Sequence, residues 1–224
     1  MNLKEFLQKV VESLVESKAR YALAGGLVAS IYRKKERITR DLDFLILADI
    51  QTQDTAETII ESFGLTPFVI RKADMEGGPM FAIKKKSTPP YLVAGRSQGD
   101  NTKIELDFIL PAIPWFDSAL DRAELNKINF SFGTIPCLTV EDLILSKFYA
   151  VNNDSRRFTD LDDLKSIFEV KHELDLGYLS GQMQKLKFPV PRGIEDLAPD
   201  ALRIISKRIR RKWSTAGLSI LLAI

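Results

Sequence analysis

Histidine and cysteine are almost absent from this chain of 224 residues, which contains one of each, His172 and Cys137. A single cysteine excludes an intramolecular disulfide and favours a cytoplasmic protein. A single histidine excludes the common zinc sites that need two, and a serine or cysteine nucleophile would have to rely on His172. His172 stands between a lysine and a glutamate, so we expect it on a solvated helix. Acid, base or metal chemistry therefore falls to carboxylates and lysines.

Long apolar segments and an excess of one charge are also lacking. No apolar run approaches ~18 residues, so we expect neither a membrane span nor a membrane partner. The N-terminus lacks the basic-then-apolar order of a signal peptide. The 32 Lys and Arg against 30 Asp and Glu give a net charge of +2, which favours no class of partner. With 45% hydrophobic residues, the composition is that of an ordinary globular protein.

Strand-like and helical segments are segregated along the chain. Apolar spacing and turn residues predict the order α-β-α-β-α, then further strands, then helices only. The expected strands are Arg20–Ala24, Asp41–Leu47, Pro67–Arg71, Met80–Lys84, Tyr91–Ala94 and Lys103–Leu110, with a hairpin over Ile128–Ile135. The expected helices are Leu3–Val15, Leu27–Arg33, Asp54–Phe63, Trp115–Ala123, Thr139–Val151, Thr159–Phe168, Leu174–Leu186 and Pro199–Trp213. This order predicts an α+β domain over residues 1–136 and a helical region over 137–224, either separate or packed on the same core.

A Gly25-Gly26 pair lies between the first expected strand and the helix that follows it. Glycines at such a turn let backbone N–H groups approach an anion, and the helix N-terminus adds a favourable partial charge. The alternative is ordinary turn chemistry, because strand-to-helix turns often use glycine.

Two pairs of acids stand in two apolar strands. Asp41 and Asp43 share one strand face because side chains alternate, and Glu105 and Asp107 do the same. Paired carboxylates are hard oxygen ligands that suit Mg²⁺. If the two strands are neighbours, one acid of the second pair completes a three-carboxylate cluster. The alternatives are solvated acids at a strand edge for the first pair and an amphipathic edge strand for the second.

The order and spacing of these features resemble a known family. Gly25-Gly26, 14 further residues and Asp41-Leu-Asp43-Phe44 are similar to the nucleotidyltransferase motif of the DNA polymerase β superfamily. The segment Arg37–Phe44 is similar to the form seen in minimal nucleotidyltransferases and AbiEii-type toxins. Downstream, Ile135–Lys147 resembles their Glu-Asp-Leu-Ile-x-x-Lys helix, and Phe158–Leu164 resembles their Asp-x-x-Asp-Leu segment. The resemblance spans about residues 20–168.

This resemblance implies a nucleotidyltransferase-like mixed β-sheet flanked by helices. It implies an enzyme that transfers a nucleoside monophosphate from an NTP to an acceptor hydroxyl, for which RNA, a protein and a small molecule are all open. Within toxin–antitoxin pairs such an enzyme has an antitoxin as its partner. The implied cofactor is Mg²⁺, or Mn²⁺, held by Asp41, Asp43 and Asp107, with Glu105 as the competitor for the third position. Asp107 would also lie near the attacking hydroxyl and accept its proton.

The resemblance also implies which residues bind the substrate. These are Gly25, Gly26, Arg37, Thr39, Arg40, Lys147 and Asp160. The two glycines would hold the phosphates, Lys147 would contact the triphosphate, and Asp160 would support Lys147 or the acceptor. Arg40 can equally pair with Asp41. The alternative for Lys147 is a solvated helix residue, and for Asp160 a first-turn acid favoured by the helix dipole.

The C-terminal part is basic. The segment Arg203–Lys212 holds six basic residues, and no acid follows them. Since the net charge of the whole chain is +2, residues 1–202 have a net charge of −4. On a helix, Leu202, Ile205 and Ile209 would face the protein and the basic residues would face solvent. Such a stripe suits the phosphates of a nucleic acid such as tRNA, and a merely solvated face is the alternative. A second hypothesis is therefore a catalytically silent relative that binds nucleic acid or a protein partner through helix 203–212.

Overall fold

The computed structural model describes residues 2–49, 51–71, 89–97, 104–154 and 156–221, with side chains described as far as residue 211. The predicted strand Met80–Lys84 lies outside these residues. Contacts between Cα atoms divide the chain into two compact units. The first combines Met1–Val28 with Arg37–Thr139, and the second combines Ala29–Glu36 with Val140–Ile224.

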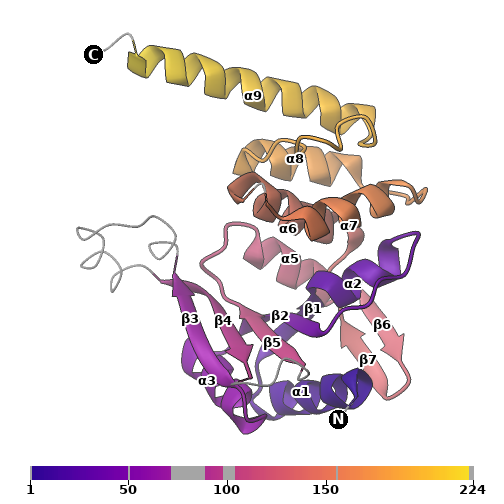
Figure 1. The fold of residues 1–224 in the computed structure, drawn as a ribbon, viewed down its shortest axis with the longest axis vertical. Helices are drawn as coiled ribbons and strands as arrows, with labels where there is room; N and C mark the ends of the chain where they lie inside the picture. The colour runs from indigo at the N-terminus through magenta and orange to yellow at the C-terminus, as the bar shows by residue number, and fades with distance from the viewer. Residues whose placement is uncertain (1, 50, 72–88, 98–103, 155, 222–224) are drawn as a thin grey trace. The chain divides into compact units, whose positions relative to one another are not determined.

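The first unit is built on a five-stranded sheet in the order β1-β2-β5-β4-β3 (Figure 1). The strands are β1 (Arg20–Ala24), β2 (Asp41–Leu47), β3 (Thr66–Arg71), β4 (Pro90–Arg96) and β5 (Glu105–Ile109). The two central strands β2 and β5 run parallel, and every other neighbouring pair is antiparallel. The predicted mixed sheet is therefore confirmed, and the two acid-bearing strands are its central neighbours.

Alternation along the central strands separates an apolar face from an acidic one. Phe44 and Phe108 are register partners whose rings are fully buried, with centroids 6.1 Å apart. The acids occupy the opposite parity, because Asp43 precedes Phe44 and Asp107 precedes Phe108. Burying the apolar face fixes the register, since a slip of one residue would turn the acids into the core.

Helices pack on this sheet and complete the first unit. They are α1 (Leu3–Glu16), the start of α2 (Gly25–Tyr32), α3 (Thr52–Ser62) and α5 (Phe116–Ala123), with a hairpin of β6 (Lys127–Phe130) and β7 (Gly133–Pro136). Asn2 and Glu5 form a capping box that starts α1. Phe6 of α1 packs edge-on against Phe63 at the end of α3, with ring centroids 5.0 Å apart, and α3 contacts β2, β3 and β4. The predicted hairpin and N-terminal helix are confirmed.

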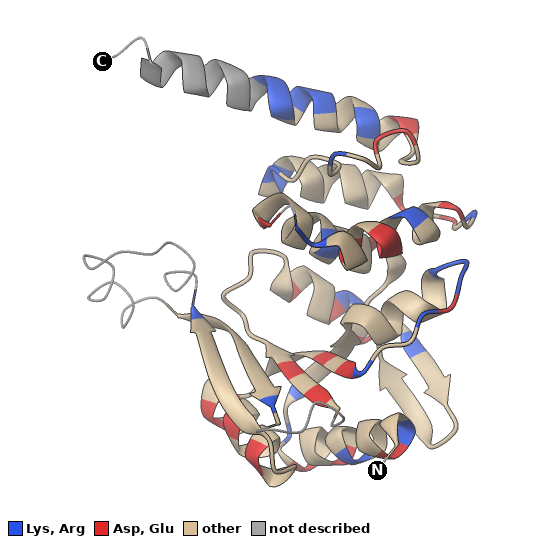
Figure 2. Ribbon diagram, in the orientation of Figure 1, with Lys and Arg blue, Asp and Glu red and all other residues tan. Residues whose placement is uncertain are grey.

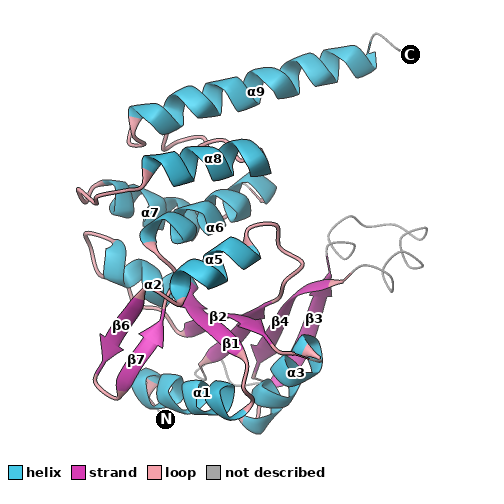
Figure 3. Ribbon diagram, turned by 180° about the vertical axis from the view of Figure 1, so that it is seen from behind, coloured by secondary structure: helices cyan, strands magenta, loops and turns pink. Residues whose placement is uncertain are grey.

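The second unit is helical (Figure 3). It contains α6 (Val140–Asn153), α7 (Phe158–Phe168), α8 (Leu176–Leu186) and α9 (Asp200–Leu221). Helix α6 contacts α7 and α8, and α8 contacts α9. Its fully buried apolar side chains include Phe148, Leu164, Ile167, Leu179 and Met183. Along the stretch of chain that the structure describes, no helix is both long and apolar enough to cross a membrane.

The predicted helix Thr159–Phe168 is confirmed as α7, which begins one residue earlier, at Phe158. Before it, the Asp154 carboxylate accepts from the Arg156 N–H at 3.0 Å. The prediction that His172 lies on a solvated helix is wrong. His172 lies in the connection between α7 and α8 and is half-buried. Its Nε2 lies 2.7 Å from the Tyr32 carbonyl oxygen, so it is a structural residue of this connection.

Candidate active site

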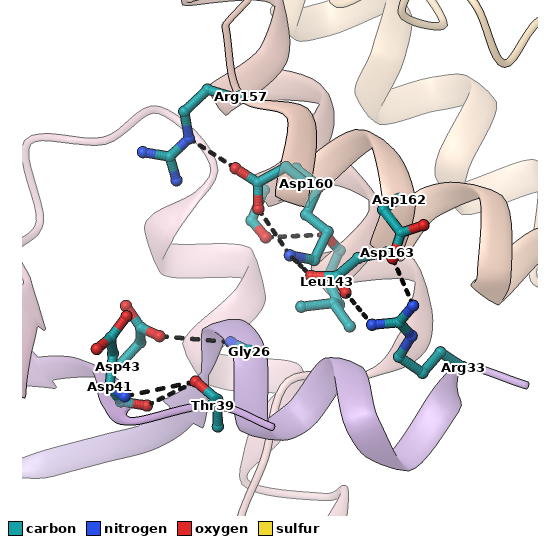
Figure 4. Close-up of polar contacts among 12 residues, drawn as sticks. Gly26, Arg33, Thr39, Asp41, Asp43, Leu143, Arg157, Asp160, Asp162 and Asp163 are labelled. Carbon is teal, nitrogen blue, oxygen red and sulfur yellow. Dashed lines mark hydrogen bonds and ion pairs between the residues drawn. The ribbon is translucent and has the colours of Figure 1, made fainter. Parts of the chain in front are cut away.

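The Gly25-Gly26 turn is shaped by Asp43. Gly25 has a φ of +61°, and a Cβ there would lie 1.8 Å from Asp43 Oδ2. The Gly26 N–H donates to the same oxygen at 3.4 Å, as Figure 4 shows. A Cβ on Gly26 would lie 2.6 Å from Arg37 Nη2 and 2.9 Å from Thr39 Oγ1. Gly25 is therefore required by its left-handed φ and by the close approach of Asp43, whereas a side chain at Gly26 would have to displace the flexible end of Arg37 and the Thr39 hydroxyl.

The four predicted acids meet on one face of the sheet. In the parallel β2–β5 pair, Asp41 is the register partner of Glu105, and Asp43 is the partner of Asp107. Neighbouring strands lie about 4.8 Å apart, so the four carboxylates form a two-by-two array at the start of both strands, where Figure 2 shows acidic residues gathered. Asp41 is exposed, and the other three are partly buried. The expectation that the two strands are neighbours is confirmed.

Arg96 at the end of β4 binds the second acid pair. Its Nη1 and Nη2 bond to the two carboxylate oxygens of Asp107, the Nη2 bond measuring 3.0 Å. Its Nε lies 3.2 Å from Glu105 Oε2. The hydrogen bond to Asp107, and then the charges of Asp107, Glu105 and Asp41, raise the pKa of Arg96 against the opposing effect of burial. Arg96 was not among the predicted site residues, because the strand expected there ended at Ala94.

The carboxylates of Asp41, Asp43 and Asp107 are the type of ligand that a hard divalent cation binds, but Asp107 is paired with Arg96. Within the described ranges, no group of three or more His, Cys, Asp or Glu side chains is gathered closely enough to hold a metal ion. Arg96 engages both oxygens of Asp107. Asp41 and Asp43 lie on one strand face, and their carboxylate oxygens are ligands of the kind that Mg²⁺ prefers.

The segment that leads into β2 brings the remaining predicted phosphate ligands close to this face. Thr39 Oγ1 lies 3.4 Å from both the Asp41 N and the Asp41 O, so its hydroxyl braces the first residue of β2. The Arg40 carbonyl accepts from the Glu105 N–H at 3.2 Å and joins β2 to β5. The Arg40 side chain is exposed, and no ion pair joins it to Asp41 in the described structure. The alternative that Arg40 pairs with Asp41 is therefore wrong.

Lys147 and Asp160, both in the second unit, form a buried ion pair. Lys147 Nζ lies 2.8 Å from Asp160 Oδ1 and 2.7 Å from Asp163 Oδ2, and its side chain is 5% exposed. The alternative of a solvated helix residue is therefore wrong for Lys147. Burial acts to raise the pKa of Asp160, but the Lys147 ammonium and then the Arg157 guanidinium outweigh it, and the net pKa lies below the ordinary carboxyl value.

This pair belongs to a larger charge network that joins residues 29–36 to α7. Asp163 is 0% exposed in its side chain and also accepts from Arg33 Nη1 at 3.0 Å. Arg33 Nη2 reaches Asp162 at 2.6 Å, and Arg157 Nε reaches Asp160 at 2.7 Å. Figure 4 shows Arg33, Asp162 and Asp163 converging in this way. Three cations and three carboxylates balance one another here.

The C-terminal helix α9 has the amphipathic pattern that the sequence predicts, and it extends to Leu221. Leu202, Ile205 and Ile209 are buried. Lys207 and Arg208 are exposed on the other side, and Figure 2 shows basic residues following one another along α9. Arg210 instead turns inward and donates to Glu195 at 2.9 Å.

A sequence profile for one family matches most of the chain. The family, described as "Nucleotidyl transferase AbiEii toxin, Type IV TA system", matches residues 6–218. This match confirms the predicted resemblance, which rested on the Gly25-Gly26 and Asp41–Phe44 motifs. No curated protein sequence matches the chain.

The chain is also similar to solved structures, at low sequence identity. The chain is 18% identical to an antigenic nucleotidyltransferase-like protein from Paracoccidioides brasiliensis, with 82% of this chain and 88% of that one covered and a TM-score of 0.46. It is 19% identical to the lincosamide antibiotic adenylyltransferase LnuA bound to lincomycin, with 73% and 97% covered and a TM-score of 0.45. At this distance the structures carry no argument about the acceptor.

Proposed function

Because this chain belongs to the AbiEii family and is a nucleotidyltransferase, we propose that it moves a nucleoside monophosphate from an NTP to an acceptor hydroxyl with the help of a divalent metal ion. The observation that carries the proposal is the acidic face of the β2–β5 pair, which stands beside the Gly25-Gly26 turn. In this reaction a bond forms between the acceptor oxygen and the α-phosphorus, and pyrophosphate leaves. Positioning and charge neutralisation supply most of the catalysis.

In this proposal the residues of the first unit bind the metal ion, bind the phosphates and accept the proton. Asp41 and Asp43 hold Mg²⁺, or Mn²⁺ in its place, with Asp107 as the third carboxylate and Glu105 as its competitor. When bound, such an ion neutralises charge on the polyphosphate. The N–H groups of Gly25 and Gly26 hold phosphate oxygens, and Arg37, Thr39 and Arg40 add donors from the segment before β2. Asp107 accepts the proton of the attacking hydroxyl.

For the second unit we propose that Lys147 contributes its positive charge to the triphosphate and that Asp160 orients Lys147. The support is the family resemblance of the Glu141–Lys147 helix segment, together with the 2.8 Å pair between Lys147 and Asp160. A structural role for the same pair makes a different prediction. Lys147→Met would then lower stability without raising the KM for NTP in the molecules that remain folded.

The test of the reaction uses NTPs labelled at the α-phosphate, with Mg²⁺ and total RNA. Transfer from the α-label and none from a γ-label identifies nucleotidyl transfer, and digestion of the product with nuclease or protease identifies the acceptor class. Asp43→Asn should reduce transfer at least about 1,000-fold, because the metal loses a ligand. Asp49→Asn is the matched control, since Asp49 is an exposed aspartate just beyond the other end of β2. Transfer that persists in Asp43→Asn, or that needs the γ-label, contradicts the proposal.

We also propose that this activity serves as a toxin counteracted by a paired antitoxin, as the family description suggests. Induced expression of the wild-type chain should arrest bacterial growth, and expression of Asp43→Asn should not. Equal arrest by both would show that toxicity does not depend on the acidic face.

The alternative from another class is a silent relative that binds nucleic acid through α9. The exposed Lys207 and Arg208 favour it. In that case RNA binding weakens in Lys207→Glu/Arg208→Glu and with rising salt, while no NTP yields a labelled product.

A further inference from the structure

We propose that Arg96 is a built-in competitor for the metal site: its guanidinium holds Asp107 and Glu105 until a divalent ion displaces it from Asp107, and it thereby sets the metal affinity of the enzyme. This inference rests on the proposed function, because it takes Asp41, Asp43 and Asp107 as the metal ligands. It concerns a residue outside every motif of the family resemblance described above.

The sheet register directs Arg96 to the acidic face. Ala94 of β4 is the register partner of Asp107, and Gly95 is the partner of Leu106. Side chains alternate, so Arg96 has the same parity as Ala94 and faces the side that carries Asp107. A Cβ on Gly95 would lie 2.9 Å from Ile60 Cγ2, which shows that Gly95 belongs to the side packed against α3. The position of Arg96 is therefore fixed by the fold rather than by a chance surface contact.

The contacts of Arg96 are the ones that a metal ion would have to replace. Both carboxylate oxygens of Asp107 bond to its Nη atoms, and Glu105 Oε2 lies 3.2 Å from its Nε. In a bidentate guanidinium–carboxylate pair of this kind, both carboxylate oxygens accept a hydrogen bond from the guanidinium. A dication on Asp107 would also repel the guanidinium across the same few ångströms.

The charges at the acidic face explain why a divalent ion can displace Arg96 from Asp107. Four carboxylates, Asp41, Asp43, Glu105 and Asp107, share the face, and Arg96 is ion-paired with two of them. Like charges this close on neighbouring strands repel one another, and a divalent cation among them relieves that repulsion. The Arg96 side chain is 35% exposed and that of Asp107 is 14% exposed. Arg96 can thus swing toward solvent, where water compensates its charge.

The experiment is a titration of the full chain with Mn²⁺ alone, with free Mn²⁺ followed by electron paramagnetic resonance. We expect Arg96→Gln to lower the Kd for Mn²⁺ about five- to tenfold, the scale of removing one partly exposed charge-assisted contact. Arg96→Lys keeps the charge but cannot grip both oxygens, so its Kd should fall between the two. Arg20→Gln is the charge control, because Arg20 is an ion-paired arginine at the opposite end of the β1–β2 pair, and it should change the Kd less than twofold.

A double variant tests whether Arg96 acts through Asp107. The gain from Arg96→Gln should disappear in an Asp107→Asn background and persist in a Glu105→Gln background. Thermal unfolding of each variant by circular dichroism checks that it is folded. The inference is overturned if Arg96→Gln binds Mn²⁺ no more tightly than wild type, if Arg20→Gln gains as much, if Arg96→Lys equals wild type, or if the gain survives Asp107→Asn.

Failure of the inference and failure of the proposed function are distinguishable. If Asp43→Asn abolishes Mn²⁺ binding while Arg96→Gln matches wild type, only the role of Arg96 falls. If Asp43→Asn and Asp49→Asn bind Mn²⁺ as wild type does, the metal site of the proposed function falls, whatever the Arg96 variants do.

Discussion

The two units each contain a charge cluster, and the clusters differ in balance and burial. The network of the second unit sets Arg33, Lys147 and Arg157 against Asp160, Asp162 and Asp163, and Asp163 at its centre is 0% exposed. The face of the first unit brings four carboxylates together on neighbouring strands, and two of them are ion-paired with Arg96. A balanced, buried cluster is complete in itself, since every charge has a partner. A cluster of like charges at the start of two central strands is costly without a cation, and such clusters are common at functional sites.

The largest expected effect is that a substitution in the buried network lowers stability, whereas a substitution in the acidic face lowers activity. Asp163→Asn should cost about 3–5 kcal/mol of unfolding free energy, because Lys147 and Arg33 would remain buried beside a neutral amide. Asp43→Asn should abolish transfer yet leave stability unchanged or slightly raised, because it relieves repulsion between like charges. Urea denaturation checks both.

Asp162→Asn is the control for the first variant. Asp162 binds the same Arg33 but is 67% exposed in its side chain, so its loss should cost less than about 1 kcal/mol. If Asp162→Asn and Asp163→Asn cost the same, burial does not set the value of this network.

The next effect concerns the glycine that touches the acidic face. Gly25→Ala should be much more damaging than Gly64→Ala, although the two have φ values of +61° and +68°. Both alanines carry the strain of a left-handed backbone, roughly 1–2 kcal/mol. Only Gly25→Ala also forces a Cβ to within 1.8 Å of Asp43 Oδ2, whereas a Cβ at Gly64 meets nothing within 4 Å.

Transfer activity and thermal stability of both glycine variants provide the measurement. We expect activity to fall at least about tenfold further in Gly25→Ala, because Asp43 must move. Equal activities would mean that Asp43 tolerates displacement, and would weaken its assignment as a metal ligand.

A smaller effect should appear in acid. The pKa of Asp160 lies below its ordinary value of 3.8 in the folded chain. Its ionised form therefore stabilises the native state fully above pH about 4 and loses that contribution as the pH falls through the folded pKa. Asp160→Asn should lose this dependence, so its unfolding free energy should fall less steeply than that of wild type below pH 4. Parallel curves for the two proteins would contradict the assignment.

The smallest expected change is at Cys137, which reports on the first unit alone. Burial raises the pKa of this thiol to about 12, and the side chain is 0% exposed. A thiol reagent should therefore react slowly with the native protein at pH 8 and quickly in urea. In Asp163→Asn without urea the slow rate should be unchanged. Faster reaction would show that loosening the charge network also loosens the sheet.

The placement of the four acids in the first unit could be predicted from the sequence because its signals are local. Alternation places Asp41 with Asp43 and Glu105 with Asp107, and the apolar residues between them mark buried strands. The sequence predicted an acid cluster only if those two strands are neighbours. The register of β2 with β5 confirms that they are. The family resemblance added the order of the motifs.

The partners of these residues could not be predicted, because they depend on contacts between distant segments. Arg96 reaches Asp107 only through the antiparallel β4–β5 register, and a strand expected to end at Ala94 gives no hint of it. The burial of Lys147 follows from the packing of α7 on α6, which brings Asp160 and Asp163 to it from the next helix. His172 looked solvated between two charged neighbours, yet it contacts the Tyr32 carbonyl oxygen far away in sequence.

The parallel pairing of β2 with β5 also has a consequence for how the acidic face forms. Asp43 and Asp107 are register partners, but β3 and β4 lie between their strands in the sequence. Closing so long a loop costs chain entropy before any contact compensates for it, so such pairings form slowly. During synthesis, Asp41 and Asp43 leave the ribosome well before their partner strand exists. We therefore expect the acidic face to assemble late, so that a chain caught before that step has the Asp41–Asp43 motif without its partner strand.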